Sequence, residues 1–209
     1  MVTARLYPQA FAYLSNGEID WPDETTLKVA LMDATFNFDD THDTWADVSA
    51  SDYSSASGYT AGGQVITTPA ISEVDSSTLT ARANSTAYAV GDIVRTGTDS
   101  GRVFVCTVAG TSTSSEPGGM ATAAFLASIT DGTVTWVNIG SAITVFDGDA
   151  VSWTGLDQTG TNAAVIYNDD GVNEPLIAYL DFQATETPTD LTITPPATGY
   201  FYLVGGGAL

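Results

Sequence analysis

The stretch AAVIYNDDGVNEPLIAYLDF, residues 163–182, contains two apolar runs separated by a turn-rich segment. Both runs, Ala163–Tyr167 and Leu176–Phe182, are rich in aliphatic and aromatic residues of the kind that strands favour. Between them, Asp169-Asp170-Gly171 supplies residue types that tolerate the backbone of tight turns. The stretch therefore predicts a β-hairpin rather than a strand followed by a crossover helix.

The same alternation of short strand-like segments and turns continues on both sides of this hairpin. A single short helix is expected at Pro8–Ser15, with Gly17 as its stop, and Ala121–Leu126 has room for a helical turn or two. We therefore predict an all-β fold, mainly an antiparallel sandwich or barrel-like domain, with one short N-terminal helix. The other predicted strands are Leu27–Met32, Val65–Thr68, Ser72–Thr80, Ala142–Phe146, Val151–Trp153 and Tyr200–Val204.

Charge divides the chain into two parts. Residues 81–140 contain three of the five basic residues and only four acidic ones, whereas residues 1–80 and 141–209 carry nearly all of the net charge of −20. Insertions are tolerated best where the two chain ends already lie close together, as at a hairpin tip. We predict an acidic β host domain, residues 1–80 plus 141–209, and an inserted small β subdomain, residues 81–140.

The acidic surplus also restricts the partners. A net charge of −20 repels nucleic acid and other polyanions. We therefore expect no nucleic-acid partner, and no apolar run is long enough to predict a membrane span. Met1–Pro8 lacks the features of a signal peptide, and Cys106 is alone in an apolar alternation, which predicts a reduced core thiol. These features indicate synthesis in a cytoplasm.

The host part contains a series of motifs that follow one another in a fixed order. They are Leu6-Tyr7 through Phe11, Asn16–Trp21, Leu27–Met32, Asp43–Val48 with Trp45, Gly58–Gly63, Asp149–Trp153, Ala164–Asp169, Pro175–Phe182 and Thr192–Thr194 followed by Gly199. In this order they resemble a family of small virion proteins of tailed bacteriophages. The resemblance covers nearly all of the host and implies a structural role on the particle, which would place the protein in the virion after assembly in the host cytoplasm.

The inserted part has a resemblance of its own. Residues 83–94, 104–111, Glu116-Pro117 and 131–136 resemble a short module of phage tail and fibre proteins, which is similar to small carbohydrate-binding domains of chitinases. In those domains exposed aromatic rings stack on sugars, so the resemblance implies a contact of Tyr88 and Trp136 with a glycan or a partner. The aromatic residue that usually follows the Glu-Pro pair is replaced here by Gly118-Gly119.

The aromatic residues also have a structural interpretation. A unit of about sixty residues has little core, so Tyr88, Phe104 and Trp136 are candidates for that core as well as for a ligand contact. Trp21, Trp45 and Trp153 are expected in the core or in a contact between subunits.

The polar residues predict no catalytic set. His42 lies among acidic residues, which raises a metal site or an acid–base pair, but no second His or Cys lies nearby to complete a transition-metal site. The oxygen ligands suit calcium better, although their spacing lacks the pattern of an EF-hand. A solvated acidic loop is the alternative; the calcium candidates are Asp39, Asp40, Asp43 and Asp47. Gly58–Gly63 is expected to form a tight turn where two backbones approach. We therefore predict no enzyme and no cofactor.

Two functions from different classes follow. The first is a capsid decoration or cement protein that forms a homo-oligomer, such as a trimer, contacts the major capsid protein and displays residues 81–140. The second is a tail or fibre-associated adhesion protein that binds host surface glycans; a glycan depolymerase is a distant third. The apolar ends Val2–Leu14 and Tyr200–Leu209 are candidate interface arms.

Overall fold

The structure is a computed structural model that describes residues 3–53, 58–98, 101–156, 160–196 and 199–204. It confirms the all-β class, because strands hold 44% of the residues and helices only 9%. The elements are β1 (Thr3–Leu6), α1 (Ala10–Asn16), β2 (Leu27–Asp33), α2 (Trp45–Val48), η1 (Ser49–Ser51), β3 (Gln64–Val65), β4 (Ala70–Asp75), β5 (Ala87–Tyr88), β6 (Ile93–Arg95), β7 (Val103–Val108), β8 (Gly110–Thr111), η2 (Met120–Thr122), β9 (Ser128–Asp131), β10 (Val134–Gly140), β11 (Ala142–Asp147), β12 (Val151–Thr154), β13 (Thr161–Asn168), β14 (Leu176–Glu186), β15 (Asp190–Ile193) and β16 (Phe201–Val204).

The chain forms two compact units. Unit 1 consists of Met1–Ile71 and Phe146–Phe201, and unit 2 of Ser72–Val145 and Tyr202–Leu209. The chain passes from one unit to the other within β4, β11 and β16, which belong to one three-stranded sheet. Residues 81–140 lie inside unit 2, whose bounds are wider, because a change of composition does not mark where paired strands begin. The predicted interface arms extend beyond the described residues at Val2 and at Gly205–Leu209.

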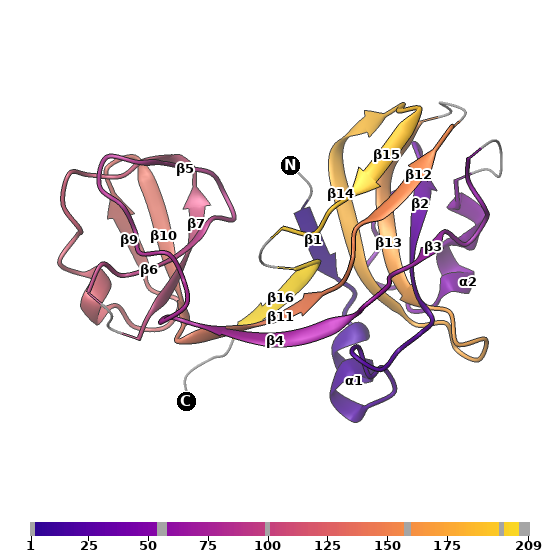
Figure 1. Ribbon diagram of the computed structural model, residues 1–209, viewed down its shortest axis with the longest axis horizontal. Helices are drawn as coiled ribbons and strands as arrows, with labels where there is room; N and C mark the ends of the chain where they lie inside the picture. Colours follow the sequence, from indigo (N-terminus) through magenta and orange to yellow (C-terminus); the bar gives the residue numbers. More distant parts are fainter. Residues whose placement is uncertain (1–2, 54–57, 99–100, 157–159, 197–198, 205–209) are drawn as a thin grey trace. The chain divides into compact units, whose positions relative to one another are not determined.

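Unit 1 is built on a five-stranded antiparallel sheet of order β1-β14-β13-β2-β3 (Figure 1). Its β13–β14 hairpin is the one predicted from residues 163–182, with Val165 opposite Tyr179. Strand β2 was predicted at Leu27–Met32, and four consecutive residues from Val29 to Met32 have no exposed surface. Successive side chains alternate between the faces of a strand, so both faces of the sheet are covered here.

A second layer covers one face of this sheet. It is the antiparallel ribbon of β12 and β15, whose Trp153 is 1% exposed and lies 6.3 Å from the ring of Tyr59. The Tyr59 hydroxyl in turn accepts the backbone N–H of Leu31 in β2 at 3.1 Å. The loop that carries Tyr59 approaches the sheet closely, as predicted: Gly63 has φ +78°, and a Cβ there would collide with the Val29 carbonyl.

The helices are short. Helix α1 ends before Gly17, which adopts the left-handed conformation, as the sequence predicts. Helix α2 was not predicted; its start is capped by Asp47, which accepts the N–H groups of Asp43 and Thr44 at 3.0 and 2.9 Å. In the segment 121–126 the only helical turn is η2. None of the helices in the described part of the chain has the length and apolarity that a membrane span requires.

Unit 2 has its own four-stranded antiparallel sheet of order β6-β7-β10-β9 and a small ribbon of β5 and β8. Alternate residues of β7 point to opposite faces: Phe104 and Cys106 belong to one apolar cluster, whereas Val103 belongs to another. The first cluster contains Val94, Phe104, Cys106, Met120, Ala123, Val134 and Trp136, and the second Val103, Ile139, Ile143 and Val145. Unit 2 therefore has packed cores on both sides of its sheet.

Candidate functional site

The structure places the two predicted contact residues of unit 2 side by side. Trp136 on β10 is 0% exposed, and its ring packs edge-on against that of Tyr88 with centroids 4.8 Å apart. Neither face of a fully buried indole is free for a sugar, so the predicted glycan contact is wrong for Trp136. Unit 2 is small, so its large aromatic residues are needed to build the core. Tyr88 is only partly buried, and its contact with a glycan or a partner stays a prediction.

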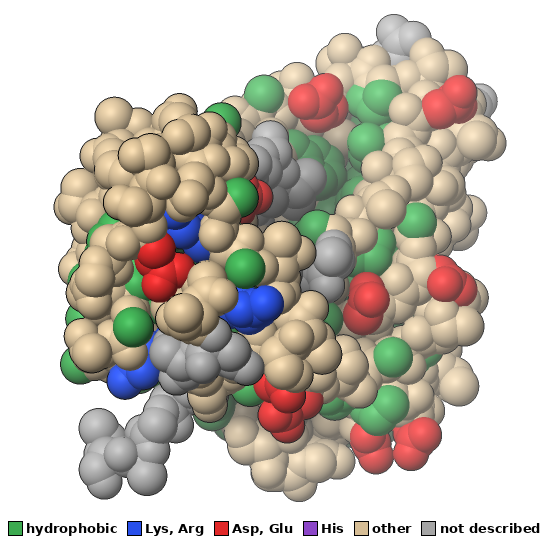
Figure 2. Space-filling model, turned by 60° about the vertical axis from the view of Figure 1, so that its left-hand side comes forward, with side chains coloured by type: hydrophobic (Ala, Val, Ile, Leu, Met, Phe, Trp, Pro, Cys, Tyr) green, Lys and Arg blue, Asp and Glu red, His purple; other side chains and the backbone are tan. Residues whose placement is uncertain are grey.

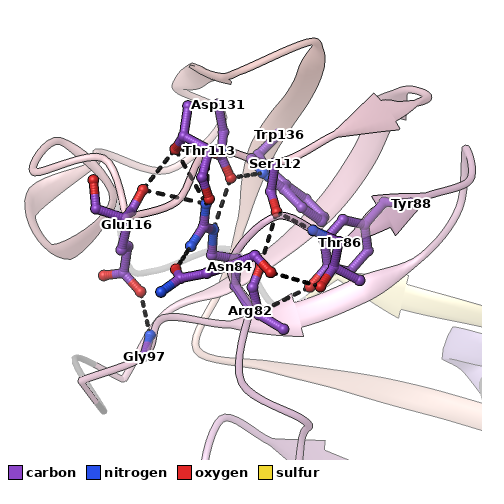
Figure 3. Close-up of polar contacts among 12 residues, drawn as sticks. Arg82, Asn84, Thr86, Tyr88, Gly97, Ser112, Thr113, Glu116, Asp131 and Trp136 are labelled. Carbon is purple, nitrogen blue, oxygen red and sulfur yellow. Dashed lines mark hydrogen bonds and ion pairs between the residues drawn. The ribbon is translucent and has the colours of Figure 1, made fainter.

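A buried ion pair lies next to this aromatic pair (Figure 3). The Nε and Nη2 groups of Arg82 each donate to a carboxylate oxygen of Asp131 at 2.8 Å, and the two side chains are 1% and 0% exposed. Asp131 also accepts hydrogen bonds from the Thr113 backbone N–H at 2.9 Å and from Trp136 Nε1 at 3.0 Å. This geometry is bidentate, the strongest form of a carboxylate–arginine contact.

These hydrogen bonds determine how Asp131 titrates. Burial by itself would raise the pKa of this carboxyl group, because it disfavours the charged form. The hydrogen bonds from Arg82, Thr113 and Trp136 outweigh burial and hold the pKa of Asp131 far below its usual range. Asp131 is therefore a permanent carboxylate and has no role as a proton donor near neutral pH.

The same arginine connects three chain segments of unit 2. Its Nη2 group donates to the backbone carbonyls of Thr113 and Ser115 at 2.7 and 3.2 Å. Its Nη1 group donates to the side-chain oxygen of Asn84. Arg82 thus fixes the loop at 113–115 and the orientation of the Asn84 amide at the surface.

A shallow hollow of about 510 Å³ opens above this arginine. One carboxylate oxygen of Glu116 accepts the backbone N–H of Gly97, which fixes that side chain at the rim. The other oxygen of Glu116 and the NH2 group of Asn84 have no hydrogen bond to the residues that the structure describes. Arg82, Ala83, Asn84, Gly97, Thr98, Ser115 and Glu116 line the hollow. A fixed acceptor beside a fixed donor suits the hydroxyl or amide groups of a polar ligand.

The other arginines of unit 2 hold backbone carbonyls. Arg95 donates to Leu79 and Thr96, at 3.0 and 2.9 Å, and Arg102 donates to Ala121 and Ala123, at 2.7 and 2.8 Å. On the face shown in Figure 2, the acidic side chains are scattered as separate carboxylates and form no continuous patch. The charge difference between the two parts of the sequence therefore does not mark a basic binding surface.

The acidic loop around His42 uses its carboxylates to hold its own backbone. Asp39 accepts the Thr41 N–H at 2.9 Å and Asp47 caps α2, and these hydrogen bonds lower the pKa of both carboxyl groups. His42 stacks on Phe36 with ring centroids 6.5 Å apart. Within the described ranges, no group of three or more His, Cys, Asp or Glu residues is placed to hold a metal ion.

The remaining predicted residues lie in or beside cores. Cys106 is 1% exposed, and burial raises the pKa of its thiol, which confirms a core thiol. Trp21 and Trp153 are fully buried in unit 1, as predicted. Trp45 is partly buried and stacks in parallel on Tyr167 at 4.4 Å.

Comparison with protein-family models, with curated proteins and with solved structures finds no match to this chain.

Sequence reasoning missed the pairing of Arg82 with Asp131. The two residues are 49 positions apart, and no spacing rule connects them. The signal that could have found it is the small number of basic residues. In a chain with only five, an arginine among small and apolar neighbours is a candidate for a buried ion pair.

Proposed function

We propose that this protein is a structural component of a bacteriophage particle, with capsid decoration or cementing as the leading assignment. The observation that supports it best is the construction of unit 2, which has its own sheet and its own cores on both faces of that sheet. A unit that packs by itself can be presented on a surface without disturbing the domain that carries it. The order of phage-type motifs along unit 1 supports the same assignment.

Homo-oligomerisation, for example as a trimer on the major capsid protein, is part of this proposal. The outer strands of the five-stranded sheet, β1 and β3, each have one edge unpaired in the described part of the chain. Unpaired edges are natural sites for pairing with another chain.

The proposal includes no catalysis by this chain. Asp52 illustrates how its acidic groups are used: burial raises the pKa of this carboxyl, and its oxygens accept the Tyr59 hydroxyl at 2.5 Å and the Gly62 N–H at 2.7 Å. Both contacts hold the loop of residues 58–63 in place, which is a structural role.

Localisation on the particle tests the proposal. Purified particles are labelled with an antibody against unit 2 and imaged by cryo-electron microscopy. Decoration predicts label in many copies over the capsid, whereas label confined to the tail would favour adhesion. Particles that contain none of this chain would overturn the assignment to the virion.

The second candidate function is adhesion to host surface glycans. The observation that favours it is the hollow between Asn84 and Glu116, because Trp136 is buried. A single shallow site of this kind is expected to bind with a Kd on the order of 1 mM, so it would act through many displayed copies. Particles that carry Glu116→Ala or Asn84→Ala should lose adhesion to a glycan array, whereas Glu73→Ala, an exposed change outside the hollow, should not. Adhesion that is equal in all three variants would exclude this hollow.

A further inference from the structure

One turn of unit 2 places a large apolar side chain in a backbone conformation that favours glycine. The Ala127 N–H donates to the Ala124 carbonyl at 3.0 Å, which makes residues 124–127 a β-turn. Leu126 occupies its third position with φ +62°. A positive φ at this position is the mark of a type II turn, where glycine or asparagine is strongly preferred and a branched residue is strained.

Burial does not compensate for this strain. The Leu126 side chain is 62% exposed, and its neighbour Phe125 is 38% exposed. Exposure also removes most of the gain that a leucine obtains from packing. Folding and stability alone would therefore favour glycine at this position, and the leucine needs another explanation.

The structure around the turn holds the strained conformation in place. Asn138, 3% exposed, donates from its side-chain amide to the carbonyls of Ala123 and Ala124 at 2.9 and 3.1 Å. Its backbone accepts the Leu126 N–H at 2.8 Å and donates to the Ala127 carbonyl at 3.0 Å. Four hydrogen bonds from one buried residue thus determine the path of the turn.

Arg102 adds a second support. Its guanidinium donates to the carbonyls of Ala121 and Ala123 at 2.7 and 2.8 Å, just before the turn. Strained residues persist where surrounding contacts over-determine them, and such residues cluster at ligand clamps and binding sites. Two polar side chains here maintain an exposed apolar pair in a fixed orientation.

The composition of the loop indicates which surface it fits. Residues 117–130 contain no charged side chain, in a chain whose net charge is −20. A contact through this loop carries no charge of its own that would have to be desolvated. The exposed parts of Phe125 and Leu126 amount to roughly 200 Å², far below the ~800 Å² per partner of a stable flat interface. Such a pair fits as an anchor inside an apolar pocket of a larger partner.

We propose that Phe125 and Leu126 form an apolar anchor that inserts into an uncharged, apolar pocket of a neighbouring protein of the particle. This inference rests on the proposed role in the virion. It assigns the strain at Leu126 to binding: the leucine is kept at the expense of stability because the anchor needs its side chain.

Leu126→Gly removes the leucine side chain of the anchor and relieves the backbone strain. The loss of binding and the gain in stability are then measured separately, as occupancy and as Tm. We expect the Tm of the isolated variant to rise by roughly 2–5 °C. Its occupancy on particles assembled without this protein and then incubated with the variant should fall at least ~10-fold below that of the unmodified chain. Ser85→Gly is the matched control: Ser85 is exposed in unit 2 with φ +49°, so its replacement should also raise the Tm but leave occupancy unchanged.

The outcomes distinguish the two proposals. Equal occupancy of the unmodified chain and Leu126→Gly would overturn the anchor and leave the role in the virion intact. Failure of the unmodified chain to bind any particle would overturn both. If the unmodified chain forms a dimer in sedimentation that Leu126→Gly abolishes, while occupancy is unaffected, the partner is a second copy and the anchor proposal is wrong.

Discussion

Arg82 and Asp131 show how a single pair of residues can organise a small unit. The pair is buried and bidentate, and the arginine also binds carbonyl oxygens of the loop at 113–115 and the side-chain oxygen of Asn84. Removal of one partner leaves the other charged and without compensation in the core, which costs far more than the loss of an exposed ion pair. The stability of unit 2 therefore depends on this contact more than on any surface charge.

The first prediction follows from the cost of leaving one buried charge without its partner. Asp131→Asn keeps the size of the side chain but leaves the Arg82 guanidinium without its counter-charge, and we expect a loss of about 3–5 kcal/mol in the free energy of unfolding. Urea unfolding followed by far-UV circular dichroism measures this loss. Glu73→Gln, an exposed change on β4, is the control and should alter stability by less than about 0.5 kcal/mol. Equal effects of the two substitutions would show that the pair is not structural.

The second prediction concerns pH. The pKa of Asp131 is lowered in the folded protein, whereas an aspartate in an unfolded chain titrates near ~3.9. The stability that this group contributes is complete above the unfolded pKa and is lost as the pH falls through that value toward the folded pKa. The difference in unfolding free energy between the unmodified protein and Asp131→Asn should therefore shrink below about pH 4. A difference that stays constant from pH 7 to pH 2.5 would contradict the lowered pKa.

The sequence predicted residue types in the core better than residue roles. Trp21, Trp153 and Cys106 lie where the apolar pattern indicates, because burial of large apolar groups follows from composition. Trp136 was also assigned to a ligand, and that assignment failed because exposure depends on how many other side chains a unit has for its core. The strain at Leu126 has no signal in the local sequence, since the path of the turn is set by the hydrogen bonds of Asn138, on the following strand β10.

At the level of elements, turn chemistry was the most reliable guide. The hairpin of β13 and β14 and the end of α1 at Gly17 are where Asp-Gly and Asn-Gly dipeptides predict them. Strand ends were less accurate: β4 spans Ala70–Asp75, whereas the sequence indicated Ser72–Thr80. Helix α2 was not predicted because it has a single turn, although Thr44 and Asp47 have the spacing of a capping box.

The third prediction tests the close approach of the loop of residues 58–63 to strand β2. Gly63 and Gly171 both have left-handed backbones, with φ +78° and +73°, but a Cβ at Gly63 collides with the Val29 carbonyl and one at Gly171 meets open space. Gly171→Ala should cost about 1–2 kcal/mol from backbone strain alone. Gly63→Ala should cost about 1–3 kcal/mol more, because the sheet or the loop must move. Chemical denaturation of both variants gives the difference, and equal costs would mean that the loop yields freely.

At the scale of the whole molecule, the change in charge along the sequence and the two compact units of the structure have different limits. The composition changes near residues 81 and 140, whereas the packed unit also includes parts of β4 and β11 and, at the end of the described chain, residues 202–204. Pairing between distant strands sets those limits, and a single sequence contains no direct record of pairing. The boundaries of the two units therefore require the structure.

The fourth prediction is that unit 1 folds without the body of unit 2. The Ser76 N–H donates to the Ser141 carbonyl at 3.1 Å, so the chain can be closed there by an Asn-Gly turn after deletion of residues 77–140. The shortened protein should keep its far-UV β signal and one cooperative thermal transition, because Trp21, Trp153 and the five-stranded sheet lie wholly in unit 1. A longer deletion, of residues 77–146, is the control: it also removes Phe146, which stacks on Phe201 at 4.6 Å and packs edge-on against Trp21 at 5.7 Å. That variant should lose at least about 3–5 kcal/mol relative to the first. If the shorter deletion unfolds as well, unit 1 depends on unit 2 for its fold, and the display of a separate module is no longer a tenable description of this protein.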